Sequence, residues 1–353
     1  MVTPMSESQN EHAPRPHATM RDVAALAGVG LKTVSRVLNE EPRVSPATIA
    51  RVRDAAQRLD YRLNVYAGDL KRADRRARTI GLIVGSVANP FSASVNRGVE
   101  DVAAALGTAV FASSLDEDQN QETRIITEML RRRVDALILT TVRRNQSHLV
   151  KEQERGTVLV FVDRAPTGIV ADTVVTDNFE GAETAVAHLL EHGHTKIAYL
   201  GDDARLWTAQ ERLRGFRARL AAQSIDPSTA PAIQDLHDEE SARVAAGILL
   251  DSADPPTALF TAQNLVTIGA IRALRERGLQ HEVALVGFDD VSLADMLEPG
   301  ITVLAQDPYR IGQLAAERAF ARLQGDRGEA QLLVVKSTLI PRGSGEIRAK
   351  EPA

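Results

Sequence analysis

The chain has 353 residues, of which 44% are hydrophobic, and a formal net charge of −5; this length predicts two or three domains with sizeable cores. It contains no cysteine, which excludes disulfides, thiolate metal sites and cysteine nucleophiles. It also lacks a run of about 18 apolar residues, so we expect no membrane span.

Residues 1–18 are polar and proline-rich, and we expect a disordered tail there. They lack the apolar core of about 7–15 residues that a secretory signal needs, so we expect a cytoplasmic protein. Residues 19–78 carry 13 Lys and Arg against 7 Asp and Glu, whereas residues 79–353 carry 28 against 38. A small basic segment on an acidic body fits a nucleic-acid-binding head joined to a non-binding core.

The segment from Thr19 to Asn39 predicts a helix-turn-helix. Thr19 is a candidate N-cap, and Asp22 suits the positive end of the first helix. A turn with Gly28 and Gly30 follows. The expected inward faces are Val23, Ala24, Leu26 and Ala27 in the first helix, and Val34, Val37 and Leu38 in the second. The outer face of the second helix, with Leu31, Lys32, Ser35 and Arg36, is expected to lie in the major groove of DNA.

This segment resembles the start of the lactose/galactose repressor (LacI-type) family of bacterial transcriptional regulators. The matching strings are Asp22-Val23-Ala24, Ala27-Gly28-Val29, Thr33-Val34-Ser35-Arg36-Val37 and Asn39. The resemblance implies a DNA-binding set of Thr19, Leu31, Lys32, Thr33, Ser35, Arg36 and Asn39. Gly30 departs from the family, which usually has Ser at the opening of the second helix, so a side-chain cap is lost.

A third helix is expected from Ser45-Pro46, an N-cap followed by a first-turn proline, to about Leu59. Its inward face is expected to be Ile49, Val52, Ala55, Ala56 and Leu59. Tyr61 is expected to pack onto the three helices.

The segment 64–71 is only weakly helical by sequence, because Gly68 costs about 1 kcal/mol in a helix. In the family the matching segment is a hinge helix that forms on DNA and inserts a leucine into the minor groove. The resemblance assigns this role to Asn64, Ala67 and Leu70. Gly68 and Asp69 depart from the family pattern, which often has Arg at the position of Gly68, so we expect a looser hinge. The charged linker 71–78 either touches phosphates or is solvated.

From Thr79 onward, apolar strand patterns alternate with helical patterns, which predicts open α/β sheets with helices on both faces. Expected strands are 80–84, 109–112, 136–139, 158–162, 174–175, 196–200, 258–260, 284–288 and 332–335. Expected helices are 94–106, 122–132, 180–192, 212–222, 239–250, 267–277 and 308–323. The fold class is therefore a small all-α helix-turn-helix head plus an α/β core of two doubly wound lobes.

The order of these elements also resembles the family's core, which has the periplasmic-binding-protein fold. The resemblance implies two lobes joined by three crossings, expected near Asn178, Gln306 and Val334. The expected parts are a tail (1–18), a head (19–63), a hinge and linker (64–78), a core (79–342) and a polar C-terminal tail (343–353). Lobe 1 is expected at about 79–177 and 307–334, and lobe 2 at about 178–306 and 335–342.

Ligands of open α/β sheets bind beyond the carboxyl ends of the strands. Phe91, after the first strand, is a candidate for stacking on a sugar or for the core. By resemblance, Arg212 opens a helix and hydrogen-bonds the effector, which suits its planar five-donor fork. Asn264 and Asp289 match polar cleft residues, although the family commonly has Asn-Asp where this chain has Asn264-Leu265. The further candidates for effector binding are Asp163, which suits a loop-holding role equally well, Trp207 and His237.

Other classes of function find less support in the sequence. His192-Gly193-His194 suits a helix terminus better than a metal site, because no third ligand is nearby. We therefore expect no metal and no cofactor. The first strand leads into Gly85-Ser86-Val87 rather than G-x-G-x-x-G, and no G-x-S-x-G elbow occurs, which disfavours an enzyme. The predicted head and the lack of a signal disfavour a transported-solute binding protein.

The sequence thus predicts a ligand-responsive, sequence-specific DNA-binding repressor of carbohydrate-use genes. Polar cleft residues dominate, so a small sugar or sugar acid is the expected effector. A purine-type co-repressor is the alternative and needs stacking by Phe91 and Trp207. Whether the effector acts as an inducer or a co-repressor stays open. We expect a homodimer on a palindromic operator, with no membrane partner.

Overall fold

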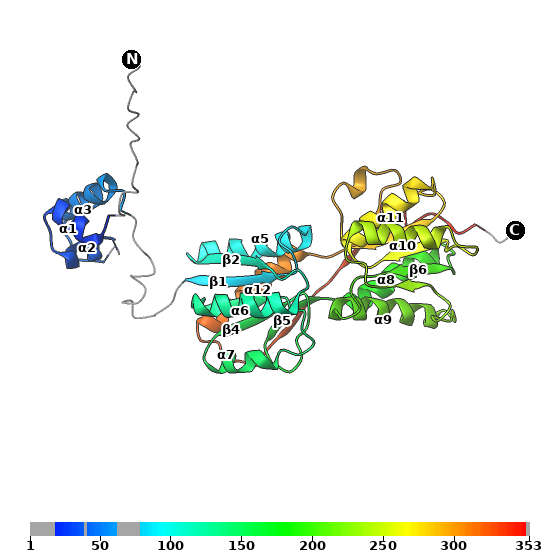
Figure 1. The fold of residues 1–353 in the computed structure, drawn as a ribbon, viewed down its shortest axis with the longest axis horizontal. Coiled ribbons are helices and arrows are strands. Elements are labelled where there is room, and N and C mark those ends of the chain that lie inside the picture. The colour runs from blue at the N-terminus through cyan, green and yellow to red at the C-terminus, as the bar shows by residue number, and fades with distance from the viewer. Residues whose placement is uncertain (1–17, 39–40, 62–77, 351–353) are drawn as a thin grey trace, which may run out of the picture. The chain divides into compact units, whose positions relative to one another are not determined.

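The computed structural model describes residues 18–38, 41–61 and 78–350. The chain divides into two units, residues 1–77 and residues 78–353, and each is described by itself (Figure 1). Four of the predicted DNA-binding residues lie outside the described residues, as do the two that depart from the family's hinge pattern: Asn39, Asn64, Ala67, Leu70, Gly68 and Asp69.

Three helices form the head: α1 (Met20–Ala27), α2 (Leu31–Leu38) and α3 (Pro46–Arg58). The predicted caps are confirmed. The Thr19 hydroxyl accepts from the Asp22 amide at 3.4 Å, and the Thr19 amide donates to the Asp22 carboxylate at 2.7 Å. Gly28, at φ 63°, ends α1 in the left-handed region, and Ser45 caps α3. These local signals fix where the helices begin and end.

The core of the head lies between the three helices, where Val23, Val34 and Val52 are fully buried. Leu26 was expected in this core but is 43% exposed. The buried stripe of α1 consists of Val23, Ala24 and Ala27, and Leu26 lies at its edge. Residues that pack against the core while partly buried include Leu38, Ile49, Leu59 and Tyr61.

Lobe 1 is a six-stranded parallel sheet in the order β11-β5-β4-β3-β1-β2. One face packs on α5 and α12, and the other on α6. Figure 1 shows helices on both faces. The strands are β1 (Thr79–Val84), β2 (Ala109–Ser114), β3 (Ala136–Leu139), β4 (Val158–Val162), β5 (Asp172–Thr176) and β11 (Leu332–Val335). The helices are α5 (Pro90–Ala105), α6 (Gln119–Arg131), the short pair η1 (Ser147–Leu149) and α7 (Val150–Glu154), and α12 (Pro308–Leu323).

Lobe 2 repeats this plan with the strand order β12-β10-β9-β8-β6-β7, in which only β12 is antiparallel. Helices α8 and α9 cover one face, and α10 and α11 the other. The strands are β6 (Ile197–Leu200), β7 (Ala232–Ile233), β8 (Ala258–Thr261), β9 (Ala284–Phe288), β10 (Thr302–Ala305) and β12 (Thr338–Ile340). The helices are α8 (Asn178–Glu191), α9 (Trp207–Ala222), α10 (Glu239–Leu250), α11 (Asn264–Glu276) and η2 (Ala294–Met296).

The chain passes between the lobes three times: from β5 into α8, from β10 into α12, and from β11 into β12. These crossings lie close to the predicted positions. They are bonded to one another, because the Thr176 hydroxyl donates to the Gln306 side chain, and the Ser337 amide donates to the Asp177 carboxylate at 2.8 Å. The crossings therefore form one connected hinge.

Residues 343–350 do not form the polar tail that we expected. Ser344 is buried, and its hydroxyl donates to the Leu285 carbonyl at 2.6 Å. Glu346 accepts from the Thr302 hydroxyl at 2.8 Å and pairs with His188. The segment packs on lobe 2 because its polar side chains find buried partners there. Across the described ranges, no helix has the length and apolar character needed to cross a membrane.

Candidate functional site

The candidate nucleic-acid interface is the outer face of α2. Leu31 and Lys32 are exposed, whereas Val34 and Val37 on the opposite face are buried, as the helical period predicted. Thr33, Ser35 and Arg36 are partly exposed. The Arg36 guanidinium lies 3.7 Å from the Glu41 carboxylate, which partly offsets its charge. Gly30 directly precedes the helix, and its carbonyl accepts from the Thr33 and Val34 amides at 2.8 and 3.1 Å.

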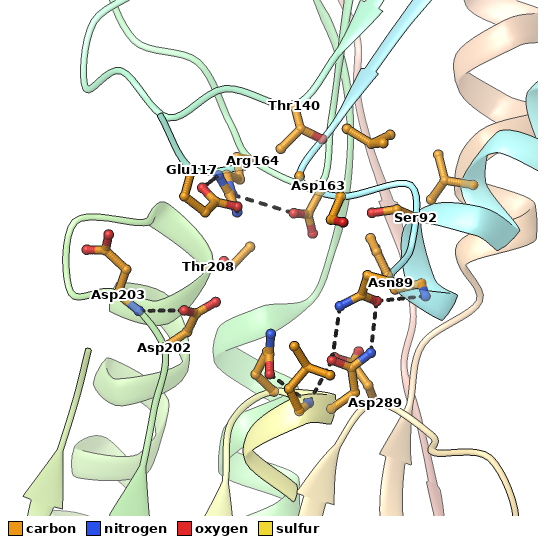
Figure 2. Close-up of a pocket in the computed structure, with 18 of the residues that line it drawn as sticks. Asn89, Ser92, Glu117, Thr140, Asp163, Arg164, Asp202, Asp203, Thr208 and Asp289 are labelled. Atoms are coloured by element: carbon orange, nitrogen blue, oxygen red, sulfur yellow. Dashed lines mark hydrogen bonds and ion pairs between the residues drawn. The ribbon is translucent and has the colours of Figure 1, made fainter. Parts of the chain in front are cut away.

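A cavity of about 610 Å³ lies between the two lobes of the core. The turns after four strands of lobe 1 (β1–β4) and five strands of lobe 2 (β6–β10) line it, as expected for open α/β sheets. Figure 2 shows polar side chains on both of its walls. Its lining includes six of the seven predicted effector-binding residues: Phe91, Asp163, Arg212, His237, Asn264 and Asp289.

Arg212 is held firmly in the wall of this cavity. It lies inside α9, which starts at Trp207, so Arg212 does not open the helix as we expected. Its Nε donates to Asn178 and its Nη1 to the Ala262 carbonyl, each at 2.7 Å, and the guanidinium lies 3.8 Å from the centre of the Phe288 ring. Within the described residues the remaining nitrogen, Nη2, has no hydrogen bond, so it is available to a ligand.

Asp163 is a largely buried carboxyl group at the end of β4, with φ 68°. Burial raises the pKa of Asp163 to about 6, and the nearby Arg164 and Arg212 only partly oppose this effect. Burial also raises the pKa of Asp202 on the facing lobe. Because a protonated carboxyl group donates and an ionised one accepts, these two groups can satisfy ligand hydroxyls in either role.

Sequence reasoning missed four carboxylates of the cavity: Asp116, Glu117, Asp202 and Asp203. Each follows a strand, so the strand-end rule already pointed to their loops. With Asp163 and Asp289 they make six carboxylates against three arginines. Two of these arginines are neutralised inside the site. Arg164 forms two bonds of 2.7 Å with Glu117 (Figure 2). Arg205 pairs with Asp203. The cavity is therefore acidic.

Asn264 contacts lobe 1 directly. Its amide donates to Asn89 Oδ1 at 2.9 Å, and the Asn89 amide donates to Asn264 Oδ1 at 3.2 Å. Asn89 also caps α5 by accepting from the Phe91 amide at 3.0 Å (Figure 2). Gln263 caps α11 in the same way, because its side chain accepts from the amides of the first turn of that helix. Each lobe thus presents a helix start to the other across the cleft.

Asp289 connects the cavity to the hinge. Its backbone has φ 74°, and its amide donates to the Leu304 carbonyl at 2.9 Å. The Gln306 side chain donates to the Asp289 carboxylate and accepts from the Thr176 hydroxyl. A ligand that binds Asp289 therefore also affects Gln306, whose side chain links the crossing after β10 to the crossing after β5.

The aromatic residues occupy different places. Phe91 lines the cavity and also packs against the core of lobe 1. His237 lines it at the surface, 3.7 Å from Asp202. Trp207, which we expected in a cleft loop, starts α9 and lines a smaller neighbouring hollow instead. The helix starts five residues before the expected Arg212, and Trp207 is not among the residues that line the large cavity.

Among the described residues, no group of three or more His, Cys, Asp or Glu side chains could hold a metal ion. His194 is buried, and its ring nitrogens lie 2.9 Å from the Thr257 hydroxyl and 2.7 Å from the Ile347 carbonyl. The His192 ring lies 2.8 Å from the His188 carbonyl. His192 thus bonds to the last turn of its own helix, α8. His194 connects the segment after α8 to the C-terminal segment.

Comparisons with known proteins match both units. A model for bacterial regulatory proteins of the lacI family matches residues 19–64, and a model for a periplasmic binding protein-like domain matches residues 186–345. The ribose operon repressor of Escherichia coli is 30% identical over 330 residues, which are 93% of this chain and 99% of that protein.

Two solved structures are also similar. A lac repressor dimer bound to operator and to the anti-inducer ONPF has a TM-score of 0.82 at 25% identity, over 94% of this chain and 99% of that one. A complex of the transcriptional regulator CelR with cellobiose has a TM-score of 0.67 at 30% identity, over 93% of this chain and 99% of that one. The similarity therefore extends over the head and the core together.

Proposed function

The chain belongs to the lacI family of bacterial regulatory proteins, and from that premise we propose how this member works. It is a ligand-responsive, DNA-binding transcriptional repressor. Its α2 lies in the major groove, where Lys32 and Arg36 contribute positive charge and Leu31, Thr33 and Ser35 meet base edges or phosphates. Thr19 and Asn39 flank this face. Asn64, Ala67 and Leu70 are proposed to supply the minor-groove contacts.

The proposed effector is a small neutral sugar. The acidic cavity carries this proposal, because six carboxylates against three arginines disfavour a bound sugar acid or sugar phosphate. Carboxyl, amide and guanidinium groups match the donors and acceptors of neighbouring hydroxyls. The bound cellobiose of CelR shows that a relative of 30% identity takes a neutral sugar. A purine has less support, because Trp207 is absent from the residues that line the cavity.

Binding is proposed to act through the angle between the lobes. Asn89, Asp163 and Phe91 come from lobe 1 or its edge, whereas Arg212 and Asp289 come from lobe 2. A sugar that contacts both sets stabilises one lobe arrangement over others. The bonds from Gln306 to Asp289 and Thr176 carry that preference into the hinge. The cleft thus senses its ligand, and the lobe arrangement transmits the signal to the head.

We further propose a homodimer on a palindromic operator. Apolar side chains are exposed on edge strand β2, on α10 and on η2, with Phe111 37%, Ile248 65% and Met296 75% exposed. The lac repressor neighbour was solved as a dimer. A second copy of this chain would cover these side chains and place two heads on symmetric half-sites.

Isothermal titration calorimetry of the full chain tests the effector class, with ribose, cellobiose, gluconate and hypoxanthine as probes. We expect saturable binding of a neutral sugar, weakened about 10- to 100-fold by Asp289→Asn because a charge-assisted hydrogen bond is lost. Glu154→Gln, at an exposed position of α7, is the control and should bind as the wild type does. Binding of gluconate or hypoxanthine alone would contradict the proposal.

A further inference from the structure

A second hollow of about 270 Å³ lies beside the cleft, where the loops after β3 and β4 meet the start of α9. It differs from the large cavity in charge, because four arginines and no carboxylate line it. The lining residues that bear on a ligand are Arg143, Arg144, Arg164, Arg205, Trp207 and Gln210.

Two of these arginines have no carboxylate partner. Arg164 and Arg205 form ion pairs with Glu117 and Asp203 of the large cavity. In the described part of the chain, Arg143 and Arg144 form no ion pair. Arg143 Nη2 donates to the neutral Thr123 hydroxyl at 2.7 Å, while its buried Nε has no hydrogen-bond partner. Glu122, a buried carboxylate that does not line the hollow, accepts the Val142 and Arg143 amides at 3.0 and 3.1 Å and offsets part of this charge. The surface of the hollow itself presents guanidinium groups and no carboxylate.

Further donors point to the same ligand chemistry. Arg164 adds a guanidinium that is only 6% exposed; its Nε forms no hydrogen bond and lies 3.6 Å from the Asp163 carboxylate of the large cavity. No side chain caps the N-terminus of the 16-residue α9, and such a helix start attracts anions. Trp207 adds a half-buried indole ring beside these cations. An aromatic ring next to guanidinium groups suits an organic anion better than a bare inorganic one.

We propose that this hollow is a second ligand site, which takes a small phosphomonoester. Arg143 and Arg144 bind the phosphate oxygens through their planar forks. Two neighbouring guanidinium groups suit the three terminal oxygens of a phosphomonoester better than the two of a carboxylate. The organic part lies against Trp207. This site is separate from the sugar cleft.

Occupancy of the hollow would also affect the arrangement of the lobes. Arg143 and Arg144 belong to lobe 1, whereas Trp207 and Gln210 belong to lobe 2. Leu206 and Ala209 already pack with the apolar cluster of lobe 1. A phosphomonoester that contacts both sides stabilises this packing, and so it favours one arrangement of the lobes.

Trp207 is the only tryptophan in the sequence, so its fluorescence reports on the hollow directly. The full chain is titrated with glucose 6-phosphate, and with glucose as the neutral match. We expect a saturable change with glucose 6-phosphate. Any change with glucose, which would act through the sugar cleft, should be the same in the wild type and in Arg144→Gln. Arg144→Gln should weaken this binding about 10- to 100-fold. Arg144 is exposed and forms no ion pair within the described residues, so its loss leaves the fold intact.

Arg327→Gln is the control, because it removes the same charge from an exposed loop of lobe 1 and should leave the affinity unchanged. Calorimetry repeats the titration without relying on fluorescence. The proposal is overturned if glucose 6-phosphate fails to bind by both methods, or if Arg144→Gln binds it as tightly as the wild type. Loss of binding in Asp289→Asn together with full binding in Arg144→Gln would place the phosphate compound in the large cavity and also overturn it.

Discussion

Asn89 and Asn264 donate amide hydrogens to each other's side-chain oxygens, at 3.2 and 2.9 Å, and so join lobe 1 to lobe 2 directly. Both residues lie at helix starts, where the backbone holds them in place. The pair therefore sets the lobe separation at the mouth of the cleft even without a ligand.

The Asn89→Ser variant tests this role of the pair. Serine keeps an N-cap for α5 but is too short to reach Asn264. We expect the lobes to open more often, because two hydrogen bonds of about 0.5–1.5 kcal/mol each are lost. Hydrogen exchange at residues 85–89 and 263–265 should become several-fold faster. Asn120→Ser, at an exposed position of lobe 1, is the control. Equal exchange in both variants would show that the pair does not hold the lobes.

Asp163 should make stability depend on pH in an unusual direction. Its pKa is raised from 3.8 to about 6 in the folded chain, so the folded state binds the proton more tightly than the unfolded state. Its contribution to the free energy of unfolding is greatest below pH 4 and is lost as the pH rises through 6. The difference corresponds to about 3 kcal/mol.

Asp163→Asn should therefore raise the free energy of unfolding at pH 8 by up to about 3 kcal/mol and change it little at pH 4. Asparagine tolerates the positive φ at this position. Urea denaturation of both proteins at the two pH values is the measurement. A variant less stable than the wild type at pH 8 would mean that Arg164 and Arg212 stabilise the carboxylate more than burial penalises it. The same variant should bind the sugar more weakly.

Glu122 is fully buried and organises the loop that follows β3. Its carboxylate accepts from the Thr141 hydroxyl at 2.8 Å and from the Val142 and Arg143 amides at 3.0 and 3.1 Å. Glu122→Ala should lower the free energy of unfolding by about 3 kcal/mol or more, because three buried donors lose their acceptor. Glu122→Gln keeps an acceptor for the two amides, so its free energy of unfolding should fall much less. Equal losses in thermal unfolding would refute this account.

Glu346 fastens the C-terminal segment to lobe 2. Although burial raises the pKa of Glu346, hydrogen bonds from Thr302, Gly343 and His188 outweigh it and hold that pKa below its usual value. Its contribution to stability is thus present above pH 4.5 and is lost as the pH falls through the lowered pKa. Glu346→Ala should cost about 2 kcal/mol at pH 7, measured by urea denaturation. Glu329→Ala, at an exposed position, should be neutral.

Lys32 is expected to contact phosphate. Lys32→Gln should weaken binding to a mixed-sequence duplex and reduce the slope of log affinity against log salt by about 1. Fluorescence anisotropy at several salt concentrations measures this slope. Arg58→Gln, at the end of α3, removes the same charge from another helix. An identical slope change in both variants would assign the effect to overall charge and not to the face of α2.

Local patterns predicted much of this fold. The caps at Thr19 and Ser45 and the buried runs of the parallel strands follow from residues that are close in sequence. The three crossings were expected from the resemblance to the family's core. The strand-end rule also brought Arg212 and Asp289 to one cavity. The caps and the strands depend on backbone chemistry that a short window of sequence contains.

Other features depend on distant partners. The start of α9 lacks a capping side chain. No local signal in the sequence therefore indicated that the helix begins at Trp207 and not at Arg212. The C-terminal segment looked like a tail because it is polar, yet Glu346 meets His188, 158 residues earlier in the chain. The amide pair of Asn89 and Asn264 spans 175 residues. Such contacts follow from the assembled lobes and leave no periodic trace in the sequence.

The three crossings have a consequence for synthesis on the ribosome. Helix α12, which covers one face of the lobe 1 sheet, and β11, which ends that sheet, are made only after residues 178–306 have been added. At about 5–20 residues per second, the first five strands of lobe 1 wait on the order of ten seconds for that cover. During this interval Val160, Val162 and Val174 lack their apolar partners on α12. A nascent chain of this length is therefore a natural client for chaperones that shield apolar sheet faces.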